Sequence, residues 1–343
     1  MAIAIAASAI ALPLVAACGS SSSGGSPAAT SSSTTAAQTA YPVTVQNCGN
    51  PVTVSAEPSR AVSNDVNTTE DMLALGLAPR MVGDFGVDSS ANAGMPSEYK
   101  TAFASVKHVS PNYFTLEPLV GLKPDFLFAG WYYGLDPTSH TLTPDNLKKF
   151  GITTLALTES CSRVATEQSI SIDATYQDLE NLGKIFNVQD KADALIASMK
   201  ATVATVQQKV AGQKPVSVFL YDSGNSSPFT APGLAMPNAL ISLAGGTNIF
   251  ASLKQSWTSV SWEKVVAAQP QCILINDYDT PTWQQKEHFL KTFKLTKDLP
   301  AVKNNCIFHL RYDQLTPSPQ NAASVEAIAK WLHPTAFGLP ANS

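Results

Sequence analysis

The chain has 343 residues, which is too long for one compact core and suits two domains of roughly 100–200 residues each. Hydrophobic residues make up 44% of it and charged residues 14%, so it can build apolar cores and is not disordered throughout. Lys and Arg total 22 and Asp and Glu total 26, a net charge of −4. No segment concentrates basic residues, which argues against nucleic-acid binding because phosphates need a basic face.

The first eighteen residues indicate export. Residues 1–17 are apolar, carry no charge and end at Val15-Ala16-Ala17-Cys18, which resembles a bacterial lipobox. We expect Cys18 to be acylated and to anchor the chain to the cell membrane from outside the cytoplasm; plain secretion with cleavage nearby is the alternative. Residues 19–40 are small and polar, and predict a flexible tether.

Four further cysteines remain, namely Cys48, Cys161, Cys272 and Cys306. An even number in an exported chain predicts two disulfides, for which three connectivities exist. The spacing favours Cys48–Cys161 and Cys272–Cys306, because each pair then lies within one half of the chain. A metal site is the weaker alternative, since no two of these cysteines are close in sequence.

Short β-like runs alternate with helical patterns along the first half. A hairpin is predicted from Val43–Val45 and Val52–Val54, and a helix with Asn67 at its N-cap and Glu70 three positions later is predicted to end at Gly76. Further strands are predicted in this order: Ala61–Ser63, Arg80–Gly83, Asp125–Ala129 and Ile152–Leu157. This rhythm predicts an α/β fold with a largely parallel sheet.

One long helix interrupts the rhythm. Residues 189–212 contain no internal Gly or Pro before Gly212, and their larger apolar residues recur at steps of one, three and four. At 1.5 Å per residue the helix spans roughly 35 Å. We interpret it as a strut between two Rossmann-like lobes, 41–188 and 213–343; an ordinary surface helix of one domain is the alternative. Strands resume in the second half at Val216–Leu220, Cys272–Ile275 and Cys306–Leu310.

Two segments share a pattern, TLEPLVGLKPDFLF at 115–128 and SWEKVVAAQPQCIL at 261–274. Each has a hydroxyl residue two positions before a Glu, and a Pro seven positions after it. The pattern predicts a capped helix with Glu117 or Glu263 in its first turn, followed by a strand. The match indicates an internal duplication rather than two unrelated capped helices.

Ligands of parallel α/β sheets bind beyond the carboxyl ends of the strands, so the loops behind the predicted strands supply the candidate ligand-binding residues. Three consecutive aromatics flanked by glycines, Trp131, Tyr132 and Tyr133, offer rigid contact area with polar tips. Arg311 is one of only four arginines and offers an anion contact, with a structural salt bridge as the alternative. The remaining candidates are Asp65, Asn67, Phe85, Tyr221, Tyr278 and Tyr312.

Signatures of catalysis are missing from the sequence. It contains no Gly-x-Ser-x-Gly, no phosphate-binding Gly-rich loop and no His-Glu-x-x-His. The five histidines are scattered singly, so a metal site is poorly supported, with His108 and His309 as its least poor candidates. We therefore expect no catalytic residue and no resident metal or cofactor.

Several segments, in order, resemble the class III substrate-binding proteins of ABC importers, which bind ferric siderophores, haem or cobalamin. They are Arg60–Ser63 with Thr69–Gly76, Leu116-Glu117 through Asp125, Ala244–Phe250 and Val260–Glu263. The resemblance covers about residues 55–335. It implies two α/β lobes bridged by a single long α-helix, with the ligand between them and small rocking motions.

The same resemblance implies the partners. Glutamates of the two repeats dock onto permease arginines in that family, and here they are Glu117 and Glu263. It implies a monomer that captures a ferric siderophore, with cobalamin or haem as alternatives. An extracytoplasmic enzyme or adhesion module on the same fold is a further alternative, and it lacks a visible base and nucleophile.

Overall fold

The computed structural model of the chain describes residues 39–341, except 89–90, 92–93, 167–168 and 279. The expected signal, Cys18 and all but the last two tether residues lie outside the described residues. Residues Ala37–Ser343 form one compact unit, within which everything below lies. In the described part of the chain, no helix combines the length and the apolar character that crossing a bilayer requires.

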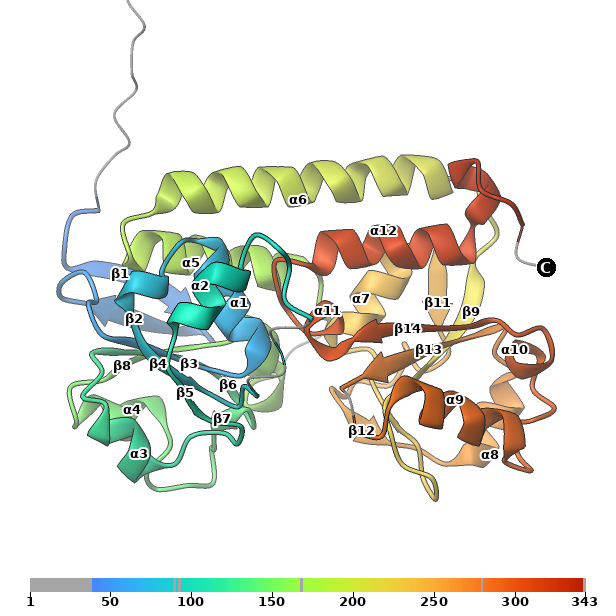
Figure 1. Ribbon diagram of the computed structural model, residues 1–343, viewed down its shortest axis with the longest axis horizontal. Helices are drawn as coiled ribbons and strands as arrows, with labels where there is room; N and C mark the ends of the chain where they lie inside the picture. The colour runs from blue at the N-terminus through green and yellow to red at the C-terminus, as the bar shows by residue number, and fades with distance from the viewer. Residues whose placement is uncertain (1–38, 89–90, 92–93, 167–168, 279, 342–343) are drawn as a thin grey trace, which may run out of the picture. The chain divides into compact units, whose positions relative to one another are not determined.

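A parallel sheet forms the N-terminal half of this unit (Figure 1). Its strands lie in the order β5-β4-β3-β6-β7, with β8 also paired to β6. The strands are β3 (Ala61–Asn64), β4 (Met81–Phe85), β5 (His108–Ser110), β6 (Phe126–Trp131), β7 (Gly134–Leu135) and β8 (Thr153–Ala156). An antiparallel hairpin of β1 (Val43–Asn47) and β2 (Asn50–Val54) precedes it. The helices are α1 (Val66–Ala74), η1 (Ala78–Arg80), α2 (Lys100–Ser105), α3 (Leu116–Gly121), α4 (Pro144–Lys148), η3 (Thr158–Arg163) and α5 (Asp173–Ile185).

A second parallel sheet, ordered β11-β9-β13-β14, forms the C-terminal half. Its strands are β9 (Val216–Tyr221), β11 (Gly246–Asn248), β13 (Cys272–Asp277) and β14 (Ile307–Arg311). Two short strands, β10 (Phe229–Thr230) and β12 (Thr258–Ser259), pair antiparallel beside it. The helices are α7 (Met236–Leu243), α8 (Trp262–Ala268), α9 (Trp283–Thr292), α10 (Pro300–Lys303), α11 (Tyr312–Leu315), α12 (Asn321–Leu332) and η4 (Pro334–Phe337).

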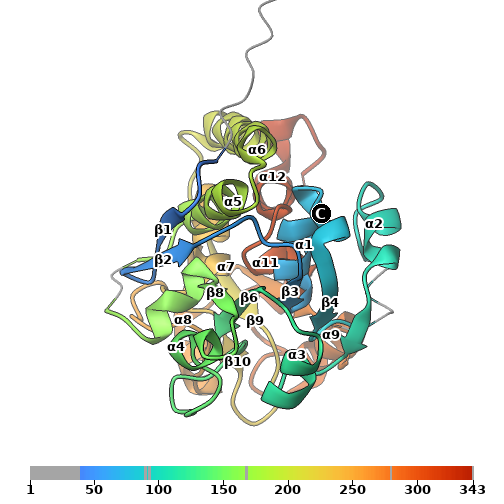
Figure 2. The same ribbon diagram turned by 90° about the vertical axis from the view of Figure 1, so that its left-hand side faces the viewer.

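The long helix α6 (Gln189–Val210) connects the two halves in the chain. It packs against α5 of the N-terminal half and against α12 of the C-terminal half (Figures 1 and 2). Its buried side chains, Ala192, Ile196, Met199, Val203 and Val206, recur at the predicted helical spacing and join the main core. The predicted fold class, α/β with two Rossmann-like sheets and one long helix between them, is confirmed. The exact lobe boundaries stay a prediction.

The structure corrects one predicted cap. Helix α1 begins at Val66, and its N-cap is Asp65, whose carboxylate accepts a hydrogen bond from the Val66 amide. Asn67 lies inside the helix, where its side-chain amide donates instead to the carbonyl of Pro317 in the C-terminal half (2.8 Å). A contact across 250 residues therefore occupies the side chain that the local pattern assigned to the cap.

The two repeated segments fold as predicted, with a difference at their caps. Thr115 and Ser261 are the N-cap residues of α3 and α8, and Glu117 and Glu263 lie in the first turns. The Ser261 hydroxyl accepts from the Lys264 amide, whereas the Thr115 side chain makes no capping bond. The match thus preserves the position of the cap but not its hydrogen bond.

Both predicted disulfides are confirmed. Cys48 is bonded to Cys161 and Cys272 to Cys306, with Cα atoms 5.1 and 4.8 Å apart. The first joins the hairpin to η3, and the second joins the starts of β13 and β14. Each bond lies within one half, so neither ties the halves to each other.

Side-chain hydrogen bonds join the halves along α1, α5, α11 and α12. We call this set the seam. Besides Asn67–Pro317, it consists of three bonds whose partners lie on opposite halves: Tyr312 hydroxyl to Asp65 (2.8 Å), Gln320 amide to Glu70 (2.8 Å) and Thr175 hydroxyl to Asn321 (2.8 Å). The polar groups of the seam are largely buried and have therefore lost their hydrogen bonds to water. Each bond of the seam replaces such a lost hydrogen bond.

Carboxyl groups with raised pKa values lie at or beside the seam. Burial raises the pKa of Glu70 well above its usual range, and neighbouring Asp313 adds to the effect. Burial also raises the pKa of Asp178 to about 8, although hydrogen bonds from Thr158 act to lower it. Asp71 is fully buried, neither of its oxygens has a hydrogen-bond partner, and burial followed by the charge of Asp178 raises its pKa. At pH values between their unfolded and folded pKa values, these groups keep protons in the folded chain that the unfolded chain releases.

We predict that stability falls as pH rises, and that Asp71 carries part of the slope. A carboxyl whose pKa is raised by folding stabilises the fold fully at pH values below its unfolded pKa. That stability is lost as pH rises toward the folded pKa. Asp71→Asn removes this titrating group, so stability should fall less steeply as pH rises above about pH 4, the ordinary pKa of an aspartate in the unfolded chain. Urea unfolding at several pH values measures it.

The matched control is Asp193→Asn, an exposed aspartate on α6. Its dependence of stability on pH should equal that of the unmodified chain. Equal slopes for Asp71→Asn and the unmodified chain would contradict the buried, protonated state of Asp71.

Candidate functional site

Aromatic side chains from both halves line a cavity of about 430 Å³, which we call the aromatic pocket. Its walls follow the carboxyl ends of strands, as expected for parallel sheets. The N-terminal half supplies residues behind β5, β6 and β8, and the C-terminal half supplies residues behind β9, β13 and β14 together with the β10–β12 pair. The lining residues are Tyr113, Tyr132, Tyr133, Arg163, Asp222, Phe229, Trp257, Tyr278 and Tyr312.

Four predicted ligand-binding residues, Tyr132, Tyr133, Tyr278 and Tyr312, line this pocket. Tyr132 follows β6 in a tight turn at φ 63° and is 50% exposed, so its ring is open to a partner. Burial raises the pKa of Tyr133 and that of Tyr312 above the ordinary range. Both hydroxyls therefore stay protonated; that of Tyr312 donates to Asp65, and that of Tyr133 accepts from Arg163.

Asp65 lies directly beneath the pocket. Its carboxylate accepts hydrogen bonds from the hydroxyls of Tyr113 (3.0 Å) and Tyr312 (2.8 Å), one from each half. Burial raises the pKa of Asp65, although these hydrogen bonds and the one from Val66 oppose it. The backbone of Asp65 has φ 92°, where residues other than glycine are strained. This backbone conformation places the carboxylate between two pocket tyrosines.

Among the described lining residues, the one cation, Arg163, is held by aromatic rings. The Arg163 guanidinium lies 4.9 Å from the ring centre of Tyr133 and 5.7 Å from that of Tyr132. It also donates to the Tyr133 hydroxyl (2.9 Å). Arg163 thus fixes the two tyrosines and keeps only part of its donors for a ligand.

The anion of the wall, Asp222, is likewise engaged. It accepts from the Asn276 amide (2.6 Å), the Tyr278 hydroxyl (3.1 Å) and the Ser223 hydroxyl (2.8 Å). The buried ammonium of Lys286 lies 3.7 Å from the ring centre of Tyr278 on the protein side. Among the described residues, the pocket wall therefore presents aromatic faces with one cation, Arg163, and one anion, Asp222.

Three predicted residues lie in the interior, away from the pocket walls. Asn67 belongs to the seam. Phe85 is 1% exposed and packs edge-on against Phe114. Tyr221 is 1% exposed and packs against Trp262 within the core of the C-terminal half. Strand residues alternate between faces, so the residue after Tyr221 rather than Tyr221 itself reaches the pocket.

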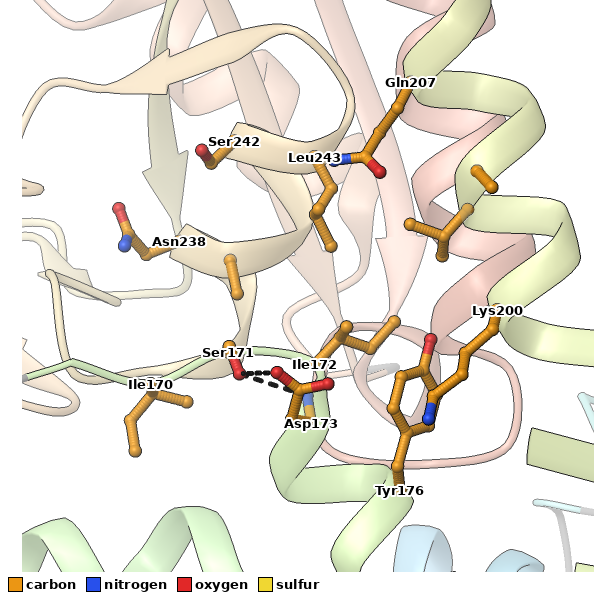
Figure 3. Close-up of a pocket in the computed structure, with 13 residues that line it drawn as sticks. Ile170, Ser171, Ile172, Asp173, Tyr176, Lys200, Gln207, Asn238, Ser242 and Leu243 are labelled. Carbon is orange, nitrogen blue, oxygen red and sulfur yellow. Dashed lines mark hydrogen bonds between the residues drawn. The ribbon is translucent and has the colours of Figure 1, made fainter. Parts of the chain in front are cut away.

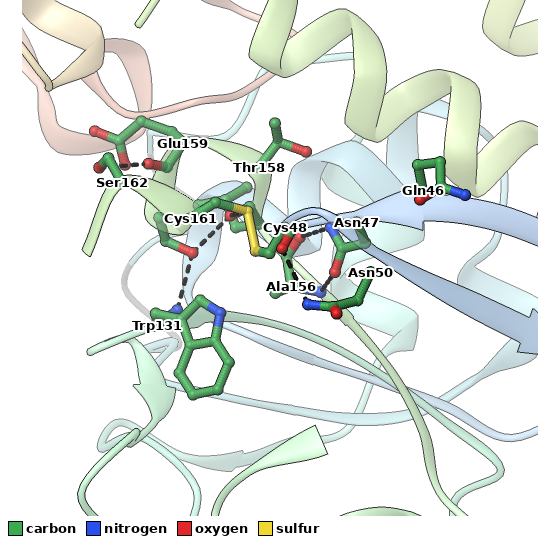
Figure 4. Close-up of a disulfide and its surroundings, with 12 residues drawn as sticks. Gln46, Asn47, Cys48, Asn50, Trp131, Ala156, Thr158, Glu159, Cys161 and Ser162 are labelled. Atoms are coloured by element: carbon green, nitrogen blue, oxygen red, sulfur yellow. Dashed lines mark hydrogen bonds between the residues drawn. A yellow bond between two sulfur atoms is a disulfide. The ribbon is translucent and has the colours of Figure 1, made fainter. Parts of the chain in front are cut away.

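Trp131 points into a different hollow. It lies beside the Cys48–Cys161 disulfide (Figure 4), in a cavity of about 570 Å³ that is also lined by Thr154 and α4 residues. The turn after β6 therefore separates the three consecutive aromatics: Tyr132 and Tyr133 line the aromatic pocket, and Trp131 does not.

Arg311 forms the salt bridge that the sequence left open as its alternative role. Its guanidinium bonds the Asp313 carboxylate (2.7 Å) and the Gln320 side chain (3.2 Å). Both partners adjoin Glu70 in the seam. Arg311 does not line the aromatic pocket.

Five lining residues escaped the sequence prediction: Tyr113, Arg163, Asp222, Phe229 and Trp257. Asp222 and Arg163 carried a usable signal, because both follow predicted strands and Arg163 is one of four arginines. Phe229 and Trp257 carried none, since they come from the small antiparallel pair beside the main sheet.

The remaining candidates are placed as follows. Glu117 and Glu263 are exposed, one in each half, on α3 and α8. Figure 1 shows both helices on the side of the unit opposite α6. His108 bonds Asp84 (2.9 Å), and His309 stacks on Trp283. Among the described residues, no group of three or more His, Cys, Asp or Glu side chains could hold a metal ion.

Comparison with known proteins identifies the family. The model of the periplasmic binding protein family matches residues 62–313. An uncharacterized ABC transporter substrate-binding lipoprotein of Bacillus subtilis, YvrC, is 26% identical over 87% of this chain and 87% of its own length. The vitamin B12-binding protein of Yersinia pseudotuberculosis is 26% identical over 63% of this chain and 69% of its own length.

A solved structure agrees with this result. A periplasmic binding protein from Veillonella parvula superposes with a TM-score of 0.73 at 26% identity, over 85% of this chain and 97% of that one. Two parallel sheets, a pocket at their strand ends and a family match across both halves lead to one conclusion: the chain belongs to the periplasmic binding protein family.

Proposed function

We propose that the chain is the substrate-binding lipoprotein of an ABC importer, and that it captures a ferric siderophore in the aromatic pocket. The observation that carries this is a pocket built by both halves from rigid aromatic side chains. Such walls suit a bulky chelate, because they offer large contact area at low entropic cost. The relative from Bacillus subtilis, with its name of substrate-binding lipoprotein, supports the transport role.

The charge of the pocket favours a chelate of low net charge. The charged lining residues Arg163 and Asp222 both form hydrogen bonds with other side chains of the protein. A trianionic chelate such as a ferric tricatecholate would bring charges that this wall leaves unmatched. A ferric trihydroxamate has three monoanionic arms around Fe³⁺ and is neutral, so we propose this class.

A corrinoid is the second candidate. The vitamin B12-binding relatives from Yersinia favour it, and aromatic walls also suit a corrin ring. The cavity of about 430 Å³ is at the small end for ligand pockets, which span roughly 300–1,000 Å³. This favours a compact siderophore over a corrinoid with its bulky nucleotide arm.

The remaining parts of the proposal follow the expected organisation. Lobes 41–188 and 213–343 hold the ligand between them, and residues 189–212 join them. Lipid on Cys18 anchors the chain outside the cytoplasm, the chain acts as a monomer, and Glu117 and Glu263 dock the permease. Two carboxylates on one side of a rigid unit suit a partner with twofold symmetry. The protein delivers its ligand unchanged and catalyses no reaction.

We predict that the purified chain binds a neutral ferric trihydroxamate at micromolar or lower concentration, with quenching of tryptophan fluorescence because Trp257 lines the pocket. The panel also contains a ferric tricatecholate, cyanocobalamin and haemin. Tyr132→Ala should weaken the trihydroxamate about 10-fold, or about 1.4 kcal/mol, because it removes an open aromatic face.

The matched control is Phe150→Ala. Phe150 is 49% exposed, as open as Tyr132, and does not line the pocket. Tighter binding of the tricatecholate would contradict the charge argument, and tighter binding of cyanocobalamin would establish the second candidate. Failure of all four ligands would refute the proposed function.

We predict that Glu117→Ala combined with Glu263→Ala abolishes uptake in cells that carry the cognate permease and leaves ligand affinity unchanged. The double variant removes the proposed contacts with permease arginines and touches no pocket residue. The control is Asp190→Ala combined with Asp193→Ala on α6, on the opposite side of the unit (Figure 1). Normal uptake by the glutamate variant, or a loss of ligand affinity, would contradict the docking role.

A further inference from the structure

A second cavity of about 420 Å³ lies where α5, α6 and α7 meet (Figure 3). We call it the hinge groove. Helix α5 belongs to the N-terminal half and α7 to the C-terminal half, while α6 connects them. The hinge groove shares no lining residue with the aromatic pocket.

An unpartnered hydroxyl points into the hinge groove. Tyr176 of α5 is 6% exposed, and its hydroxyl has no hydrogen-bond partner. Figure 3 shows this hydroxyl directed toward the space between Leu243 and Gln207. Burial raises the pKa of Tyr176 to about 12, so the group keeps its proton and can donate. A buried donor of this kind calls for an acceptor.

A cation lies beside this donor. The Lys200 ammonium is 5.1 Å from the ring centre of Tyr176. The carboxylate of Asp173 also lines the groove, and one of its oxygens accepts a hydrogen bond from the Ser171 hydroxyl (2.9 Å; Figure 3). One end of the groove therefore combines a hydroxyl donor and an ammonium, a pair that suits a carboxylate, while the Asp173 carboxylate beside them is bonded to Ser171.

The wall of the groove next to these groups is apolar. Ile172 and Val203 are 5% and 6% exposed, and the half-buried Ile170 and Leu243 extend the same wall. An alkyl chain laid on this wall would leave water, which favours binding in proportion to the apolar area covered.

From this arrangement we infer that the hinge groove is a binding site for a medium-chain carboxylate, with its head on Tyr176 and Lys200 and its alkyl chain against Ile172, Val203 and Leu243. The site is separate from the proposed capture of a metal chelate and goes beyond it. Its occupant contacts both halves and the helix that joins them.

The test is calorimetric titration of the full chain with sodium decanoate. We expect saturable binding to one site, weakened about 10-fold by Tyr176→Phe and by Lys200→Ala. Decanol lacks the charge and acetate lacks the chain, so both should bind at least 10-fold more weakly than decanoate. Lys209→Ala is the matched control, because Lys209 lies on the same helix, 5.2 Å from the ring centre of Phe337, and outside the groove.

Two further measurements separate binding from folding and from the aromatic pocket. Tyr176→Phe keeps the ring and removes an unpartnered hydroxyl, so the unliganded variant should melt at the same or a higher temperature. Tyr132→Ala should leave decanoate affinity unchanged, which separates this test from that of the siderophore. Undiminished binding to Tyr176→Phe, equal binding of decanol, or no binding of decanoate would overturn the inference.

Discussion

The carboxylate of Asp65 links the two halves through hydrogen bonds. It accepts hydrogen bonds from Tyr113 of the N-terminal half and Tyr312 of the C-terminal half. To reach both, the residue adopts a strained backbone at φ 92° and caps α1 at the same time. Neither disulfide crosses between the halves. Their alignment therefore depends on α6, on the apolar core that both halves share and on the seam, and Asp65 joins that seam to the wall of the aromatic pocket.

The seam explains why a pocket can exist at this place. A wide hinge would expose Glu70 and Asn67 to water and break their bonds to Gln320 and Pro317. Because α6 also packs on both halves, we expect small rocking rather than wide closure. The tyrosines of the pocket are then preorganised before a ligand arrives, which lowers the entropic cost of binding. The raised pKa of Glu70 follows from the same burial and makes the seam sensitive to pH.

Patterns that depend on local sequence predicted the fold well. The hairpin, the long helix, most strand positions along the chain and both disulfides followed from hydrophobic periodicity, turn residues and cysteine spacing. Asn67 shows where such reasoning fails. Its side chain was assigned to a local cap, yet it bonds Pro317, 250 residues away. No periodicity reports a partner at that distance, so the seam could not be predicted.

The sequence predicted the location of the pocket but only some of its lining residues, and the reason is geometric. The rule that ligands bind beyond the carboxyl ends of parallel strands located its walls and yielded Tyr132, Tyr133, Tyr278 and Tyr312. Successive residues of a strand point to opposite faces of the sheet. Which residue at a strand end faces the pocket therefore depends on where this alternation stands when the strand ends. At the end of β9 this alternation buries Tyr221 and places Asp222 on the pocket wall. At β6 a turn with Tyr132 at φ 63° sends Trp131 toward the disulfide. A strand end can thus be recognised from its sequence, whereas the direction of its last side chains depends on register and turn geometry that only the folded chain supplies.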